Sequence, residues 1–352
     1  MTLANRGFLG MIHHSMQELA RAAIAAPSAD NSQPWKLRIS EGQLSAFAPP
    51  EPNFFGPGDH ATLLSIGAVA ENLVQTMAAS QGGGQLKVRD LARGQPYFDV
   101  ELASADQPLV VPPHILDRHT NRHPYASTPV PGEVVEPIKS LKEGAAKVVV
   151  LASQGELAEF IRISIICSES RFRTPELHRW LMDSLRYTAE EVARGDGLDM
   201  RTLHLPPGGR SFMRFIKDWR RMEFLNRFGA YRLLAQAEAD VLRKTAAIVL
   251  ITGRDGLKEA FDAGRLMERV WLALNAAGWA VQPAYVIPDQ SNRMLSESLP
   301  RACREDIAKA LADLRKFLRQ PEQERLHIAL RVGLATKTPV RSRRRSCAFS
   351  VS

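Results

Sequence analysis

The stretch S-I-G-A-V-A-E-N-L-V at residues 65–74 can be laid on D-A-G-R-L-M-E-R-V-W at residues 262–271. Both stretches contain Gly-x-x-x-Glu and an apolar stripe at helical spacing, so each predicts a long helix. Small residues such as these glycines let two backbones approach each other closely. A feature repeated at corresponding places indicates an internal duplication. We therefore expect two related halves, each with a long central helix.

The remaining pattern predicts a mixed α+β chain. Helices are expected at 15–26, 61–79, 131–142, 257–277 and 305–318. Strands are expected at 35–39, 44–48, 86–90, 97–103, 146–151, 246–252, 279–286 and 326–332. A proline-rich connector separates a first half, 1–110, from a second half, 111–352, which carries a mostly helical insertion at about 154–240.

Composition indicates an ordinary globular protein, with 45% apolar and 24% charged residues. No apolar run approaches the ~20 residues that span a bilayer. The cysteines at 167, 303 and 347 form no C-x-x-C pair, which favours a reducing compartment, and we expect a cytoplasmic protein. Five basic residues between 337 and 345 account for most of the net charge of +8, so neither nucleic acid nor a membrane is expected as a partner.

Several catalytic motifs are missing from the sequence. It contains no G-x-x-x-x-G-K-[ST] phosphate loop, no strand-to-helix G-x-G-x-x-G, no G-x-S-x-G elbow and no H-E-x-x-H. The three histidines at 114, 119 and 123 are interpreted as polar loop residues, and no metal site is expected. The motifs of hydrolases, kinases and metalloenzymes are thus absent.

Three polar clusters remain: A-P-S-A-D-N-S-Q-P-W at 26–35, R-H-T-N-R-H-P-Y at 118–125, and R-S-R-R-R at 341–345. Arginines with hydroxyls between them suit a phosphate monoester, and amide side chains suit a flat heteroaromatic ring. Together they are typical of a mononucleotide-like cofactor. The clusters could equally be a helix cap and turn, surface ion pairs and a disordered basic tail.

The first cluster resembles the A-P-S-x-x-N-x-Q-P-W signature of nitroreductase-like flavoproteins, which bind FMN. The second cluster, followed by P-V-P at 129–131, is similar to the R-x-S-x-R segment of that family. L-R-V-G at 330–333 and the terminal arginines resemble the family's last strand and phosphate-contacting tail. The resemblance implies an α+β nitroreductase-like fold, with antiparallel-rich mixed sheets and long central helices.

The clusters stand in the reverse of the order found in single-domain members of the family. This order resembles the Acg-type branch, in which two nitroreductase-like halves are fused into one chain as an internal pseudo-dimer. The resemblance implies a single flavin site at the interface between the halves. Whether the fused unit is a monomer or forms a homodimer stays open.

Carried over residue by residue, the resemblance assigns two sets of contacts to FMN. The phosphate, ribityl chain or pyrimidine edge would meet Arg118, Thr120, Asn121, Arg122, Arg344 and Arg345. The ring would be held by Pro27, Ser28, Asn31 and Gln33, and passed by Pro283, Ala284 and Tyr285. No catalytic side chain is assigned, because the flavin carries the chemistry.

Two functions follow from the resemblance. One is an FMN-dependent oxidoreductase that passes hydride or electrons from NAD(P)H to a small electron-poor acceptor of the nitroaromatic or quinone type. The other is a flavin-sequestering protein with a lid and little or no reductase activity. The segment 213–235, rich in Phe, Trp, Met and Arg, is expected to be an amphipathic cover helix or such a lid. A nucleic-acid binder is disfavoured.

Overall fold

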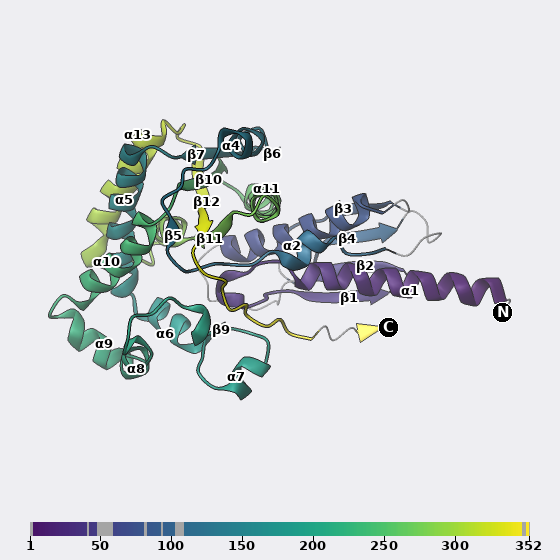
Figure 1. Cartoon of the computed structure of the whole chain (residues 1–352), viewed down its shortest axis with the longest axis horizontal. Helices are drawn as coiled ribbons and strands as arrows, with labels where there is room; N and C mark the ends of the chain where they lie inside the picture. Colours follow the sequence, from purple (N-terminus) through teal and green to yellow (C-terminus); the bar gives the residue numbers. More distant parts are fainter. Residues whose placement is uncertain are drawn as a thin grey trace.

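The computed structural model describes residues 3–40, 42–47, 59–80, 83–92, 94–102, 109–346 and 350–351, and their side chains between residues 13 and 346. Two largely antiparallel sheets lie apart in the molecule, one formed mainly by the first third of the chain (Figure 1). The first sheet has the order β13-β1-β2-β4-β3. Its strands are β1 Lys36–Ser40, β2 Gln43–Phe47, β3 Gly84–Val88, β4 Pro96–Leu102 and β13 Ser350–Val351.

The second sheet has the order β11-β12-β10-β7-β6, and β5 pairs with the end of β12. Its strands are β5 Tyr125–Ala126, β6 Lys142–Glu143, β7 Ala146–Leu151, β10 Ala247–Arg254, β11 Ala280–Ala284 and β12 Glu324–Ala335. A small parallel pair joins β8 Leu185–Arg186 to β9 Leu198–Asp199. The sheets divide between the two expected halves, except that β13, from the end of the chain, pairs with β1.

Some of the helices in the described structure cover the two sheets, and others pack among themselves. They are α1 Leu3–Ile24, α2 His60–Ala78, α3 Pro113–Asp117, α4 Gly132–Lys139, α5 Gln154–Phe172, α6 Pro175–Ser184, α7 Ala189–Ala193, α8 Gly209–Phe215, α9 Trp219–Asn226, α10 Ala230–Arg243, α11 Leu257–Ala276, α12 Val286–Leu295 and α13 Arg304–Leu318. Short 3-10 turns are η1 Ala29–Asn31, η3 Met200–Thr202 and η4 Arg301–Cys303. The mixed α+β class with antiparallel sheets is confirmed. Among the described helices, none is both long and apolar enough to cross a membrane.

The two echo helices, α2 and α11, pack directly on each other between the sheets. Gly67 of α2 lies against the backbone of Phe261 and Arg265, and Gly264 of α11 lies against that of Leu64. A Cβ at either glycine would collide with a carbonyl oxygen of the other helix. These glycines occupy matching positions in the two echoed stretches. The closest approach of the helices therefore falls where the sequence repeats.

One hydrophobic core runs from the first sheet through α2 and α11 to one face of the second sheet. The opposite face of that sheet packs on α5, α12 and α13. Strand β10 contributes side chains to both cores, because successive side chains of a strand point to opposite faces of the sheet. Val249 and Ile251 point toward α11, whereas Ile248 and Leu250 point toward the second core. Helix α5 thus packs directly on the second sheet.

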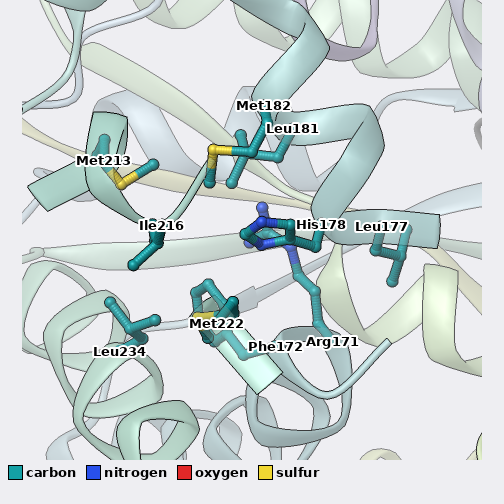
Figure 2. A pocket seen from close by; sticks show the side chains of 10 residues that line it. All are labelled: Arg171, Phe172, Leu177, His178, Leu181, Met182, Met213, Ile216, Met222 and Leu234. Carbon is teal, nitrogen blue, oxygen red and sulfur yellow. The ribbon is translucent and has the colours of Figure 1, made fainter. Parts of the chain in front are cut away.

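Helices α6, α8 and α9 share a third, smaller core with the short β8–β9 pair. It surrounds a cavity of about 20 Å³, with room for roughly one water molecule. Figure 2 shows the side chains that line this cavity, from Arg171, Phe172, Leu177, His178, Leu181, Met182, Met213, Ile216, Met222 and Leu234. The inward faces of these helices are therefore already packed against one another.

The sequence-based expectations differ from the structure in several places. Helix α1 begins at Leu3 rather than at residue 15. The segment 213–235 is three short helices rather than one, because Asp218 caps α9 and Gly229, with φ of 87°, ends the turn before α10. Helix α12 follows β11 where a strand to residue 286 was expected, and Pro288 concealed it. Proline is tolerated there because amides of the first helical turn have no intrahelical partner.

Replacing Gly67 by alanine is expected to lower the free energy of unfolding by about 2–3 kcal/mol, because the new methyl collides with backbone rather than a movable side chain. This loss would occur although alanine favours a helix by about 1 kcal/mol over glycine. Urea denaturation measures it. The control is Gly155→Ala in α5, where a Cβ meets nothing within 4 Å, so stability should hold or rise slightly. Equal behaviour of the two variants would refute the close-packing requirement.

Candidate functional site

The loop between α1 and β1 contains three residues in the left-handed backbone region. Asp30, Asn31 and Gln33 have φ of 47°, 58° and 51°. Asp and Asn tolerate these angles, but Gln seldom adopts them. The Gln33 amide N–H donates a 2.9 Å hydrogen bond to Ser28 Oγ, which holds the turn closed. Strain of this kind concentrates at functional sites.

The amide side chains of this loop bind two distant segments of the chain. Asn31 Nδ2 donates to the carbonyl oxygens of Gly197 at 3.0 Å and Arg343 at 2.9 Å. Gln33 Nε2 donates to the Gly195 carbonyl oxygen at 2.8 Å. These amide donors therefore connect the loop to the 195–197 turn and to the C-terminal tail.

The C-terminal tail in turn donates hydrogen bonds to the side chains of the loop. The Arg345 backbone N–H donates to Gln33 Oε1 at 3.0 Å, and its guanidinium lies 2.9 Å from Asp196 Oδ2. The Arg344 guanidinium donates to Asn31 Oδ1. The loop, the 195–197 turn and the tail form one unit, which we call the clasp.

Two guanidinium groups converge at the beginning of the clasp. Arg118 Nη2 donates to the Ala25 carbonyl oxygen at 2.7 Å, and Arg344 Nη2 donates to the same oxygen at 3.4 Å. Arg118 Nε also lies 3.0 Å from Glu268 Oε1, with both side chains buried, and its guanidinium stacks 4.6 Å from the centre of the Trp271 ring. Two cations therefore face one buried carboxylate.

The electrostatics of this group follow from its burial. Burial and the nearby positive charge of Arg118 together lower the pKa of Arg344 to about 9. Burial also raises the pKa of Glu268 to about 7, although Arg118 and Arg344 favour its ionised form. Charged groups held out of water in this way lack full compensation. An anion beside the two arginines would supply it.

A third arginine is less engaged. Arg122 is half-buried, and in the described part of the chain its side chain makes no hydrogen bond or ion pair. Burial lowers the pKa of Arg122, and Asp30 of the clasp partly offsets that effect. Two buried oxygens, Ser32 Oγ and Gln282 Oε1, also have no hydrogen-bond partner among the described residues. Unsatisfied groups therefore lie in the 27–33 loop and in the 118–122 segment, and next to Pro283 on β11.

The 118–122 segment lies along the free edge of the second sheet. Thr120 forms a parallel bridge with Val281 of β11, and the Asn121 N–H donates to the Val281 carbonyl oxygen at 3.0 Å. Pro283 and Ala284 follow on the same edge strand. Asn121 is fully buried, and its Nδ2 donates to the Lys337 carbonyl oxygen at 3.1 Å.

The side chain of Tyr285 takes part in a separate buried network. Its hydroxyl lies 2.7 Å from His60 Nδ1, and His60 Nε2 lies 2.9 Å from His327 Nδ1. His327 Nε2 is 2.9 Å from the Arg254 carbonyl oxygen, which can only accept, so this nitrogen carries the proton. With both rings neutral, His60 Nε2 must then donate to His327, and the Tyr285 hydroxyl must donate to His60.

The predicted residues thus fall into three places. Ser28, Asn31, Gln33, Arg118, Arg344 and Arg345 meet in or beside the clasp, and Pro27 is buried at its start. Thr120, Asn121, Pro283 and Ala284 lie on or against β11, while Arg122 faces Asp30. The Tyr285 side chain lies in the histidine network.

Sequence reasoning missed Glu268 and the glycines at 195 and 197 as parts of this region. Glu268 was visible as the glutamate that the two echoed stretches share, but nothing in the sequence indicated Arg118 as its partner. Gly195 and Gly197 lie in a stretch interpreted only as a polar loop, although their φ values of 76° and 65° require glycine. The contact of Gly195 with Arg344, almost 150 residues later, depends on the tertiary structure.

Two cavities of the described structure lie away from these residues. One is the small methionine-rich cavity of Figure 2. The other is a surface groove of about 480 Å³ on α5, bordered by Arg243. The first is far too small for a flavin, and neither is lined by a residue of the clasp.

No model of a known protein family matches the chain. Uncharacterized protein MT1398 of Mycobacterium tuberculosis (strain CDC 1551 / Oshkosh) is 26% identical over 281 residues, which cover 75% of this chain and 38% of that protein. The chain thus spans well under half the length of this relative.

Solved structures similar to the chain include nitroreductase-like, FMN-dependent proteins. The FMN-dependent nitroreductase NfnB from Mycobacterium smegmatis in complex with NADPH is 15% identical, with 66% of this chain and 92% of that chain covered and a TM-score of 0.38. A nitroreductase with bound FMN from Bacteroides fragilis NCTC 9343 is 10% identical, with 65% and 94% covered and a TM-score of 0.35. With TM-scores this low, the likeness establishes no shared activity.

The clasp predicts that Gly195→Ala releases the C-terminal tail. The variant adds a Cβ that collides with the Arg344 carbonyl oxygen, at a backbone φ of 76° that already disfavours a side chain. Trypsin should then cut at Arg343–Arg345 at least about tenfold faster under native conditions, because proteolysis follows the open population. Mass spectrometry of the digest measures the rate.

The matched control is Gly208→Ala, which has φ of 79° but open space around the new Cβ. It carries the same backbone strain without touching the tail. Equal cleavage of the tail in the two variants would show that Gly195 does not hold it.

The histidine network predicts acid sensitivity. Burial lowers the pKa of His327 to about 4 and that of His60 well below its ordinary value, with Arg325 adding to both effects. Unfolded histidines titrate near pH 6.5, so the unfolded state binds more protons below that pH. The contribution of the two histidines to the free energy of unfolding should therefore be complete above about pH 6.5. It should fall toward pH 4, by up to about 1.4 kcal/mol per pH unit for each histidine.

Urea denaturation at a series of pH values measures this slope. A His60→Leu, His327→Leu double variant should lose most of it, whereas His14→Leu, at an exposed position, should retain it. An unchanged slope in the double variant would assign the acid sensitivity to carboxylates instead.

Proposed function

We propose that the chain is a nitroreductase-like FMN-binding oxidoreductase whose flavin site lies between the clasp and the free edge of β11. The observation that carries the proposal is the convergence of Arg118 and Arg344 on the Ala25 carbonyl oxygen, where Glu268 is their buried counter-charge among the described residues. Such a site favours a dianion, and arginine suits phosphate geometry. The A-P-S-x-x-N-x-Q-P-W resemblance identifies FMN as the phosphate-bearing group.

The described residues fit such a ligand in chemistry. Arg122 would contact the phosphate or ribityl chain, helped by Arg118 and Arg344. Ser32 Oγ and Gln282 Oε1 are buried and unsatisfied, and so are suited to polar ligand atoms. Pro283, Ala284 and Tyr285 would pass the ring through the main chain. Bound FMN supplies hydride and electron transfer, while the protein orients it and provides positive charge.

We propose further that the chain is of the Acg type, with halves 1–110 and 111–352 related as an internal pseudo-dimer. Glu71 binds Arg269 at 2.7 Å, while Glu268 faces Asn72. In the echo, 71 matches 268 and 72 matches 269, so the two contacts exchange partners. Reciprocal contacts of this kind are typical of a two-fold interface. The Gly67–Gly264 approach has the same symmetry.

The favoured activity is transfer from NAD(P)H through FMN to an electron-poor nitroaromatic or quinone, in the cytoplasm. The alternative is flavin sequestration, which is favoured by the engagement of the clasp amides with protein groups rather than an open cavity. Anaerobic addition of NADH or NADPH to the FMN-loaded protein separates the two. Bleaching of the flavin band supports the reductase, and a stable band supports sequestration.

The Arg122→Ala variant tests the proposed phosphate contact. Loss of a charged contact should weaken FMN binding by about tenfold or more. Riboflavin, which lacks the phosphate, should bind the variant and the parent equally. Fluorescence quenching of each flavin on titration with protein measures both affinities, and Arg179→Ala, at an exposed position, is the control.

Arg118 needs a paired substitution. Removing it alone would leave the buried Glu268 without its ion-pair partner, and breaking a buried ion pair in this way destabilises proteins by several kcal/mol. Arg118→Ala should therefore be combined with Glu268→Gln. Failure of the parent protein to retain or take up FMN would contradict the proposed function itself, whereas normal FMN affinity of both arginine variants would relocate the phosphate site.

A further inference from the structure

The outer surface of α8, α9 and the start of α10 exposes an unusual set of side chains. Exposed apolar side chains here are Phe212, Phe215, Phe224, Phe228 and Leu233, with 37% to 76% of their surface accessible. Every phenylalanine exposed in the described structure lies in this short segment. We call these five side chains and the basic residues among them the tip surface.

The exposed side chains of the tip surface are not needed for packing its own helices together. Ile216 and Met222 fill the inner face, where Figure 2 shows them beside the small cavity. The exposed phenylalanines belong to none of the three hydrophobic cores. Monomeric proteins rarely gather exposed apolar side chains in this way without a binding partner.

The charges of the same segment are one-sided. Residues 208–233 contain seven Arg or Lys and two acidic residues, a net charge of +5. All seven basic side chains are exposed. None of them forms an ion pair with a carboxylate in the part of the chain that the structure describes. The tip surface is therefore both apolar and net positively charged.

We propose that the tip surface docks on an anionic lipid bilayer. Phenylalanine and leucine side chains between arginines are typical of segments that lie in the membrane interface. Basic residues near an anionic leaflet add attraction that salt screens. In Figure 1, α8 and α9 form an outer corner of the molecule, away from both chain ends, which leaves this surface free to meet a flat partner.

Other partners fit less well. A two-fold contact between copies of this chain through the same surface would oppose two charges of +5, which repel. Single-stranded nucleic acids prefer aromatic faces within a charged groove. Here Phe224 and Phe228 pack edge to face at 5.3 Å on a protruding corner. The proposal replaces the sequence-based expectation that no membrane is a partner, and it does not depend on FMN binding.

Vesicle flotation of the full chain tests the proposal. Vesicles of phosphatidylcholine with an equal part of phosphatidylglycerol should bind the protein at about 0.1 M salt and release most of it at about 0.5 M, whereas pure phosphatidylcholine binds little. A Phe224→Ser, Phe228→Ser variant should bind at least about tenfold more weakly, because two inserted rings are lost. Both side chains are exposed, so the variant should fold, as circular dichroism will show.

The matched control is Leu295→Ser, another exposed apolar side chain, on α12, where 68% of the surface is accessible. It should bind like the parent. Absence of binding to the anionic vesicles, or an equal loss in both variants, would overturn the proposal. So would binding of a single-stranded oligonucleotide that depends on Phe224 and Phe228, in a protein that ignores the vesicles.

Discussion

The close contact between α2 and α11 is the constraint on which the rest of the structure depends. Each helix covers its own sheet, so the distance between them sets the distance between the two sheets. Gly67 and Gly264 allow backbone-to-backbone contact, and no side chain larger than hydrogen fits at either position. The contact also sets Glu71 and Glu268 opposite each other's helix, where burial demands cationic partners.

The two glutamates are neutralised in different ways. Glu71 is held by Arg265 and Arg269 of α11, within the helix pair. Glu268 takes its partner, Arg118, from the connector between the halves. Arg118 in turn reaches the end of α1 and stands beside Arg344 of the tail. The packing of α2 on α11 buries Glu268, and Glu268 binds Arg118. This one ion pair places Arg118 beside Arg344, which makes the site at the end of α1 positively charged.

The clasp gives the loop at 26–35 a structural role beside its proposed ligand role. Asn31 and Gln33 use their amides on the 195–197 turn and on the tail. Three segments from the beginning, middle and end of the chain are therefore locked together.

The main elements could be predicted from periodicity, because their apolar spacing is strong. The echo helices, the β1–β2 hairpin and the central strand β10 lie within a few residues of their expected places. Helix α12 could not be predicted in this way. Its Pro288 indicates a break in a helix when only the sequence is known, although proline is tolerated in the first turn, where it lies. The pairing of β13 with β1 and the division of 213–235 into three helices depend on distant contacts and on Gly229, which periodicity does not report.

The site shows the same division. Sequence alone determined which residue types are present, since arginine forks and amide side chains keep their donor and acceptor chemistry in any fold. Only the tertiary structure decided which of them meet. Arg118 joins Glu268 and Ala25 because burying a glutamate on α11 requires a cation within about 3 Å. No local pattern encodes that encounter, because the two residues are 150 positions apart and are brought together by helix packing.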